Sequence, residues 1–116
     1  MLQHVALEVA PDTVADCVAF WALLGFERAS KPERLQTSST WVAREGTQIH
    51  LMPQADPAIA AKGHVAVVAP DFERVVLALS EAGYSVRQAE SVWDAPRCTV
   101  RDPAGHLIEI MSAPPP

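Results

Sequence analysis

The N-terminal segment of the chain shows a two-residue period of polar and apolar positions. In residues 3–9, His4, Ala6 and Glu8 fall on one face, and the valine and leucine side chains fall on the other. This spacing is typical of a half-buried strand, because successive side chains of a strand point to opposite sides. Residues 64–68 repeat the pattern and open with His64. The alternation therefore predicts two related strands, each beginning with a histidine.

A helical pattern follows each of these strands. The first helix is expected to begin at Pro11-Asp12, with Asp12 as its N-cap, and to end at Gly25. The second is expected to be capped by Asp71 and to end at Gly83. Its apolar residues recur at the spacing of one helix face: Phe72, Val75, Val76 and Leu79.

Three shorter strands are predicted after each helix, so that each half reads β-α-β-β-β. They cover about residues 26–30, 39–44, 47–52, 84–89, 97–101 and 106–111. Module 1 spans about residues 1–53, a linker spans 54–62, and module 2 spans about 63–113. We expect a single α+β domain over residues 1–116. Its two tandem modules would form a curved eight-stranded mixed sheet with the helices on the convex side.

The repeat places candidate metal ligands at equivalent positions. Alternation puts His50 on the face opposite Ile49 and Leu51, and it puts Glu109 opposite the isoleucines beside it. His4, His50, His64 and Glu109 are thereby expected on the open face of the sheet. A pseudo-two-fold axis between the modules would let them converge on one ion. Imidazole and carboxylate ligands with open positions suit Zn, Ni, Mn or Fe(II).

Composition narrows the class of partner. The 116 residues carry a formal net charge of −5 without a basic stripe, so a nucleic acid partner is not expected. The N-terminus lacks the basic region and apolar stretch of a signal peptide, and no apolar run is long enough to span a membrane. The two cysteines, Cys17 and Cys98, are expected to be free thiols. We expect a cytoplasmic protein.

The doubled plan resembles the vicinal oxygen chelate superfamily, the glyoxalase, bleomycin resistance protein and extradiol dioxygenase group. The motifs that carry the resemblance are His4-Val5-Ala6-Leu7, Phe20-Trp21 with Leu24-Gly25-Phe26, Gly63-His64-Val65-Ala66-Val67, and Asp102-Pro103-Ala104-Gly105-His106-Leu107-Ile108-Glu109. By resemblance, His4, His64 and Glu109 occupy the three metal-ligand positions that most metal-binding members share. Glyoxalase I enzymes carry Glu where this chain has His50, which makes His50 a candidate fourth ligand and a different base. The resemblance also implies a homodimer.

These residues indicate a metal-dependent lyase or isomerase that stabilises an enolate of a small, oxygen-rich substrate. His50 and Glu109 are its candidate catalytic residues, and Glu8 is a candidate hydrogen-bond partner of a ligand imidazole. The alternatives are an Fe(II) extradiol-type dioxygenase and a non-catalytic, drug-binding resistance protein. His106, at the exit of the Asp102–Gly105 turn, is expected to be a solvated surface residue.

Overall fold

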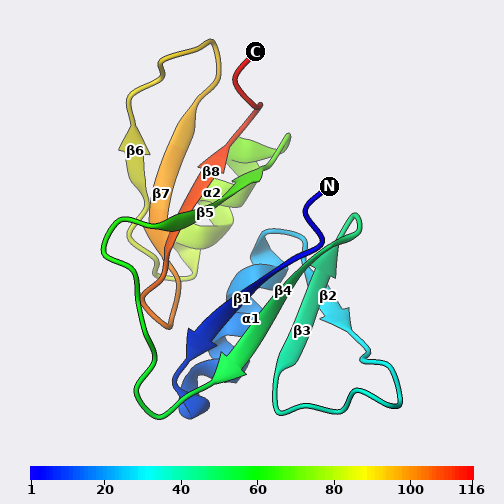
Figure 1. Cartoon of the computed structure of the whole chain (residues 1–116). Helices are drawn as coiled ribbons and strands as arrows, with labels where there is room; N and C mark the ends of the chain where they lie inside the picture. The colour runs from blue at the N-terminus through cyan, green and yellow to red at the C-terminus, as the bar shows by residue number, and fades with distance from the viewer. The chain divides into compact units, whose positions relative to one another are not determined.

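Both halves of the chain fold into the same succession of elements. The computed structural model describes residues 1–116, which divide into two compact units, Met1–Ile59 and Ala60–Pro116. The first unit contains β1 (His4–Val9), a 3-10 turn (Pro11–Thr13), α1 (Val14–Leu23), β2 (Glu27–Ala29), β3 (Thr40–Arg44) and β4 (Thr47–Pro53) (Figure 1). The second contains β5 (His64–Val68), α2 (Phe72–Glu81), β6 (Arg87–Ala89), β7 (Arg97–Arg101) and β8 (Leu107–Met111). We call the two units module 1 and module 2.

The eight strands divide into two four-stranded mixed sheets, one in each module. Their orders are β1-β4-β3-β2 and β5-β8-β7-β6. In both sheets the first strand runs parallel to the last strand of its module, and the remaining pairs are antiparallel. The equivalence extends to the register, since Ala6 pairs with His50 and Ala66 pairs with Glu109. The α+β prediction with tandem β-α-β-β-β modules is confirmed.

One face of each sheet is packed against the helix of its own module. In module 1, Ile49 and Leu51 of β4 are buried together with Phe20 and Trp21 of α1. In module 2, the buried core includes Val75 and Leu79 of α2, Cys98 and Val100 of β7, and Ile108 and Ile110 of β8. Burial of this apolar area provides the main stabilising free energy of each module. The opposite face, which we call the open face, carries His50 or Glu109, as the alternation predicts.

Both helices end at a glycine in the left-handed region, as predicted. The φ angles of Gly25 and Gly83 are 87° and 95°. The next amides, of Phe26 and Tyr84, donate to the carbonyls of Trp21 and Leu79 at 3.0 Å. These bonds satisfy carbonyls at the helix end that would otherwise lack partners. The strand β6 begins at Arg87 rather than at residue 84 as predicted.

The predicted N-cap residue is wrong for α1 and right for α2, and neither N-cap makes a side-chain capping bond. A 3-10 turn precedes α1, so that Thr13, rather than Asp12, occupies the N-cap position, and it makes no side-chain capping bond. Asp71 does occupy the N-cap of α2, but its carboxylate pairs with Arg74 rather than with a backbone amide at the helix start. Asp12 lies within the 3-10 turn, because Pro11 begins that turn and keeps Asp12 away from the helix boundary.

The structure also bears on the expectations for the two cysteines and for membrane-spanning segments. Cys17 and Cys98 are both buried, and no disulfide joins them, as expected. Neither helix has the length and apolar character that crossing a bilayer requires.

Candidate functional site

Module 2 brings His64 and Glu109 together on its open face. The parallel register pairs Ala66 of β5 with Glu109 of β8, so the side chain of His64 reaches Glu109 diagonally across the two strands. Nε2 of His64 lies 3.2 Å from Oε2 of Glu109. The side chain of His64 is 41% exposed and that of Glu109 is 12% exposed. The predicted pairing of these two residues on one face is therefore present within the module.

The second ring nitrogen of His64 is also held in place. Nδ1 donates to the carbonyl of Lys62 at 2.9 Å, so a neutral ring would point the lone pair of Nε2 at the carboxylate of Glu109. Two such acceptors at 3.2 Å repel each other unless they share a proton or a cation. Ligands about 2.1 Å from a common ion lie roughly 3–3.5 Å apart at tetrahedral or octahedral angles. The pair therefore fits two neighbouring ligands of a divalent metal.

Arg97 of β7 neutralises the other oxygen of the Glu109 carboxylate. Its Nη1 lies 3.0 Å from Oε1 of Glu109, and its Nε donates to the carbonyl of Glu90 at 2.8 Å. Its guanidinium also lies over the ring of Trp93, 5.6 Å from the centroid. The half-buried carboxylate thus lies between a guanidinium and an imidazole. The charge-assisted contact with Arg97 fixes its orientation and leaves Oε2 directed at His64.

The charge of Glu109 also affects the pKa of a residue on the buried side of the sheet, Cys98. The pKa of the Cys98 thiol is raised to about 11, first by burial and second by the negative charge of Glu109. A thiol with so high a pKa stays protonated and is a poor nucleophile. Cys98 therefore belongs to the core of module 2 and not to its reactive groups.

Module 1 presents a stack of three aromatic rings at the equivalent place. His50 lies between His4 and Trp41, with ring centroids 4.1 Å from each. The interplanar angles are 13° to His4 and 2° to Trp41. Trp41 reaches this position because it is the direct register partner of His50 across β3 and β4. The stack was not predicted from the sequence, although alternation along β3 places Trp41 on the open face.

Hydrogen bonds fix the orientation of both rings in the stack. Nδ1 of His4 donates to Oε1 of Gln3 at 2.6 Å, and Nε2 of His50 donates to Oε1 of Gln48 at 2.8 Å. Each ring therefore keeps one nitrogen with a free lone pair, Nε2 in His4 and Nδ1 in His50. The pKa of His50 is lowered from 6.5, first by burial and second by the positive charge that His4 carries when protonated. A neutral His50 is suited to accept a proton or to ligate a metal.

The stack lies in a hollow of about 480 Å³ on the open face of module 1. Its polar wall consists of Gln3, Thr37, Ser39 and Gln48, and its apolar wall includes Leu35 and Met52. Leu35 is a large exposed side chain, 47% accessible, beside the exposed edge of the hollow. This hollow is large enough for a small organic molecule lying against the rings.

The lowered pKa of His50 leads to a prediction about pH. In an NMR titration, the imidazole of His50 is expected to titrate below 6.5, and His4→Ala is expected to raise this pKa only partway, because burial remains. The folded state binds the proton less readily than the unfolded state. The free energy of unfolding is therefore expected to fall as the pH drops through 6.5 towards the folded-state pKa. A His50 pKa at or above 6.5 would contradict this.

Glu8 and His106 lie away from both clusters. Oε1 of Glu8 accepts from the amide of Ala58 at 3.2 Å, and a hydrogen bond from a ligand imidazole to Glu8 stays a prediction. His106 is 8% exposed, so its expected position as a solvated surface residue is wrong. The reason is the turn before it. Oδ1 of Asp102 accepts from the amides of Ala104 and His106 at 3.0 and 2.8 Å, which folds His106 inward.

The four candidate ligands thus form two pairs, each within one module. His4 and His50 share the ring stack in module 1, and His64 and Glu109 share the ion pair in module 2. Neither module by itself gathers three histidine, cysteine or carboxylate side chains that could hold a metal ion. Arg97 is not among the predicted site residues. Alternation along β7 is the sequence signal that could have identified it, because this alternation puts Arg97 on the face of Glu109.

Comparisons with known proteins agree with this architecture. The model of the glyoxalase-like domain family matches residues 4–111, so the chain belongs to this family. Among solved structures, a glyoxalase family protein from Bacillus anthracis is 25% identical with a TM-score of 0.84, covering 96% of this chain and 93% of that chain. The comparison with curated proteins finds no match.

Two more distant structures share the fold. Lactoylglutathione lyase from Agrobacterium tumefaciens is 16% identical with a TM-score of 0.73, and the match covers 96% of this chain and 92% of that chain. TnmS3, an antibiotic binding protein from Streptomyces sp. CB03234, is 16% identical with a TM-score of 0.69, covering 95% and 93%. Members of the vicinal oxygen chelate fold therefore include both a lyase and a binding protein, and the site must distinguish between them.

Proposed function

We propose that this protein is a metal-dependent lyase or isomerase of glyoxalase type, acting on a small substrate rich in oxygen. The observation that carries the proposal is the pair of donor atoms in module 2. Nε2 of His64 and Oε2 of Glu109 lie 3.2 Å apart, and the hydrogen bond of His64 to Lys62 directs the lone pair of Nε2 towards that carboxylate. In known metal sites, a hydrogen bond from the second ring nitrogen of a histidine ligand orients that ligand in the same way.

The proposed ligands are His64, Glu109 and His4, with His50 as a fourth. The family resemblance supports this set of ligands. The ion is Zn, Ni, Mn or Fe(II), because these suit mixed imidazole and carboxylate ligands. When bound, the metal acts as a Lewis acid that stabilises negative charge developing beside a substrate carbonyl.

The side chains of the chain itself position and move the proton. His50 is neutral near pH 7, since its pKa is lowered, and its Nδ1 is the atom that would accept a proton from the substrate. Gln48 holds the ring in this tautomer. Arg97 holds the carboxylate of Glu109 in place through the contact of its Nη1 with Oε1 at 3.0 Å. The hollow beside His50, with hydroxyl groups and an apolar wall, would hold the substrate.

Metal titration tests the proposal. Protein stripped with a chelator is expected to bind about one divalent ion per chain when Zn, Ni, Mn and anaerobic Fe(II) are supplied in turn. His64→Ala is expected to weaken binding strongly, because it removes a ligand. Val68→Ala, on the same strand and also exposed, is the matched control and should bind like the wild type. Wild-type protein that remains empty in excess of all four ions would refute the metal site.

A specific observation favours a second function, the sequestration of a planar ligand. The stack of His4, His50 and Trp41 lines the hollow of module 1. Flat rings with their edges fixed by hydrogen bonds are good partners for a planar aromatic molecule. The antibiotic binding protein of the same fold supports this reading.

An iron-dependent dioxygenase is the remaining alternative from the family resemblance. It would require Fe(II) or Mn for turnover and would consume oxygen, whereas a lyase or isomerase would accept several redox-inert ions. Assembly as a homodimer and binding of a small-molecule substrate stay predictions.

A further inference from the structure

The open face of module 2 carries an excess of positive charge in an otherwise acidic protein. The formal net charge of the chain is −5. Register pairs Arg87 with Thr99, Thr99 with Glu109, and Arg101 with Leu107, so both arginines lie on the face of Glu109. Arg97 is the first residue of β7 and Arg101 is its last, and the alternation along this strand puts both on the same face. Three guanidinium groups therefore share this face with a single carboxylate on β6, β7 and β8.

Only Arg97 is neutralised by an acid. It forms the ion pair with Glu109 at 3.0 Å. Arg101 donates to the backbone carbonyls of Gly105 and Ala61, at 3.1 and 3.5 Å, and forms no ion pair. Arg87 forms no ion pair either. Because a guanidinium has five N–H donors, both Arg87 and Arg101 retain donors for a ligand.

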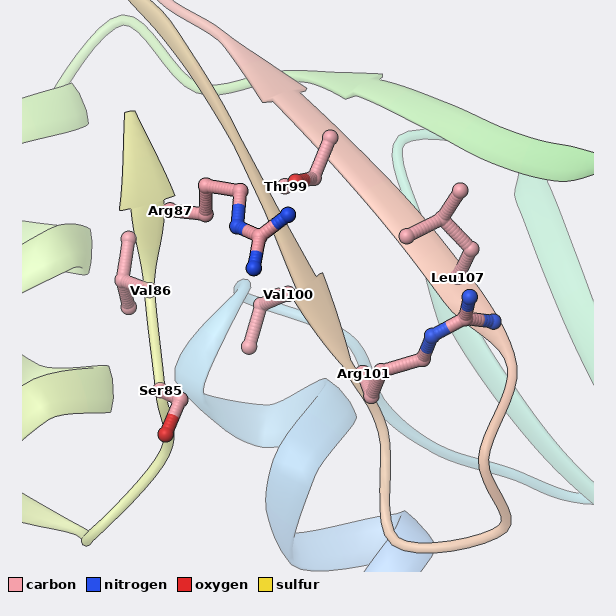
Figure 2. Close-up of a pocket in the computed structure, with 7 residues that line it drawn as sticks. All are labelled: Ser85, Val86, Arg87, Thr99, Val100, Arg101 and Leu107. Carbon is pink, nitrogen blue, oxygen red and sulfur yellow. The ribbon is translucent and has the colours of Figure 1, made fainter. Parts of the chain in front are cut away.

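Arg87 and Arg101 line a hollow of about 470 Å³ between β6 and β7. Figure 2 shows the guanidinium of Arg87 extending from β6 towards Thr99, with Val100 between Arg87 and Arg101. The rest of the lining consists of Ser85, Val86, Thr99, Val100 and Leu107. No acidic side chain contributes to it.

We propose that this hollow binds a small oxyanion, the carboxylate or phosphate group of an organic acid. Guanidinium forks match the planar arrangement of oxygens in a carboxylate and also bind phosphate. The hydroxyl groups of Ser85 and Thr99 supply further donors. No acidic residue lines the hollow, so no carboxylate of the protein competes with the anion for the two guanidinium groups. The apolar wall accommodates the carbon skeleton of the acid. The hollow holds one such group, whereas an extended polyanion would need a long basic surface that this chain lacks.

The subsite lies on the same face as Glu109 but does not use that residue. If the metal proposal is also correct, the oxyanion would anchor the end of the substrate remote from the metal, which would make the substrate a small organic acid. That refinement rests on the proposed function, while anion binding itself does not. The test therefore uses metal-free protein, so that each proposal can fail without the other.

The experiment is an NMR titration of metal-free wild-type protein at constant ionic strength. The probes are inorganic phosphate, malonate and, as a neutral analogue, malonamide. Saturable shifts are expected for the amides of Ser85, Thr99 and Val100 with at least one of the two anions and not with malonamide. Saturation with phosphate alone identifies a phosphate site, and saturation with malonate identifies a carboxylate site.

Variants locate the binding groups. Arg87→Gln is expected to weaken anion binding about tenfold or more, because it removes a charged hydrogen-bond donor from the hollow. Arg101→Lys keeps the charge but loses the fork, and it is expected to weaken binding less. Arg74→Gln, on α2, makes the same change in net charge away from the lining and should bind like the wild type. Thermal unfolding checks that each variant is folded.

Two results would overturn the inference. One is the absence of saturable shifts at these amides with either anion. The other is that both Arg87→Gln and Arg101→Lys bind with wild-type affinity, which would place any bound anion elsewhere on the protein.

Discussion

Replacing Leu79 with alanine is expected to lower the free energy of unfolding by about 2–5 kcal/mol. Leu79 is 0% exposed and packs from α2 into the core of module 2. Its removal forfeits buried apolar area and leaves a cavity among side chains that relax only partly. A domain of this size typically has a stability of about 5–15 kcal/mol. Chemical denaturation, read by circular dichroism, should therefore show a large decrease in midpoint.

Leu77 provides a matched control on the same helix. It is 58% exposed, so Leu77→Ala makes the same chemical change without removing a core contact. Its effect is expected to stay within about 0.5 kcal/mol, as is usual for surface positions. Equal effects of the two substitutions would mean that the face of α2 has been assigned incorrectly. Unequal slopes of the denaturation curves would instead indicate a change in the unfolding transition.

The second large effect concerns Glu109→Gln. This variant keeps the size of the side chain but loses the charge that a metal ligand requires. Loss of a residue that only hydrogen-bonds a metal ligand typically lowers metal affinity about 10–100-fold. Because Glu109 is a proposed ligand itself, we expect a larger loss of affinity. Turnover with any redox-inert divalent ion should be lost with it. Glu73→Gln, an exposed carboxylate on α2, is the control for the same loss of charge and should keep both properties.

A thiol titration gives an internal check on Glu109→Gln that does not depend on the metal. The pKa of Cys98, about 11 in the wild type, should fall partway, since the charge of Glu109 is removed but burial remains. A folded variant with this altered thiol and unchanged metal affinity would exclude Glu109 as a ligand.

The same variant separates the two proposed functions. If the protein sequesters a planar ligand in module 1, Glu109→Gln should keep ligand affinity, because stacking on His4, His50 and Trp41 does not need the carboxylate. Trp41→Ala should then weaken binding, since it removes the outer ring of the stack. If the protein is an enzyme, Glu109→Gln should lower turnover far more than Trp41→Ala does.

Much of the architecture could be predicted from local patterns. Alternation correctly assigned the two faces of β4 and β8, so that His50 and Glu109 fall opposite Ile49 and Ile108. The repeat of the N-terminal histidine strand predicted two equivalent modules, and Gly25 and Gly83 marked both helix ends. These predictions succeed because strand alternation and helix termination depend on residues close together in the chain.

The contacts of the site were decided by the tertiary structure. The ring stack requires His4, Trp41 and His50 to meet from three strands, and the pairing of Arg97 with Glu109 depends on the register of β7 and β8. The burial of His106 likewise follows from how the Asp102 turn folds back on itself. Such contacts join residues by strand register and side-chain packing, and neither of these is encoded in the spacing of residues along a single strand. The sequence by itself therefore determined which side chains face the open side of each sheet, and the tertiary structure decided which of them touch.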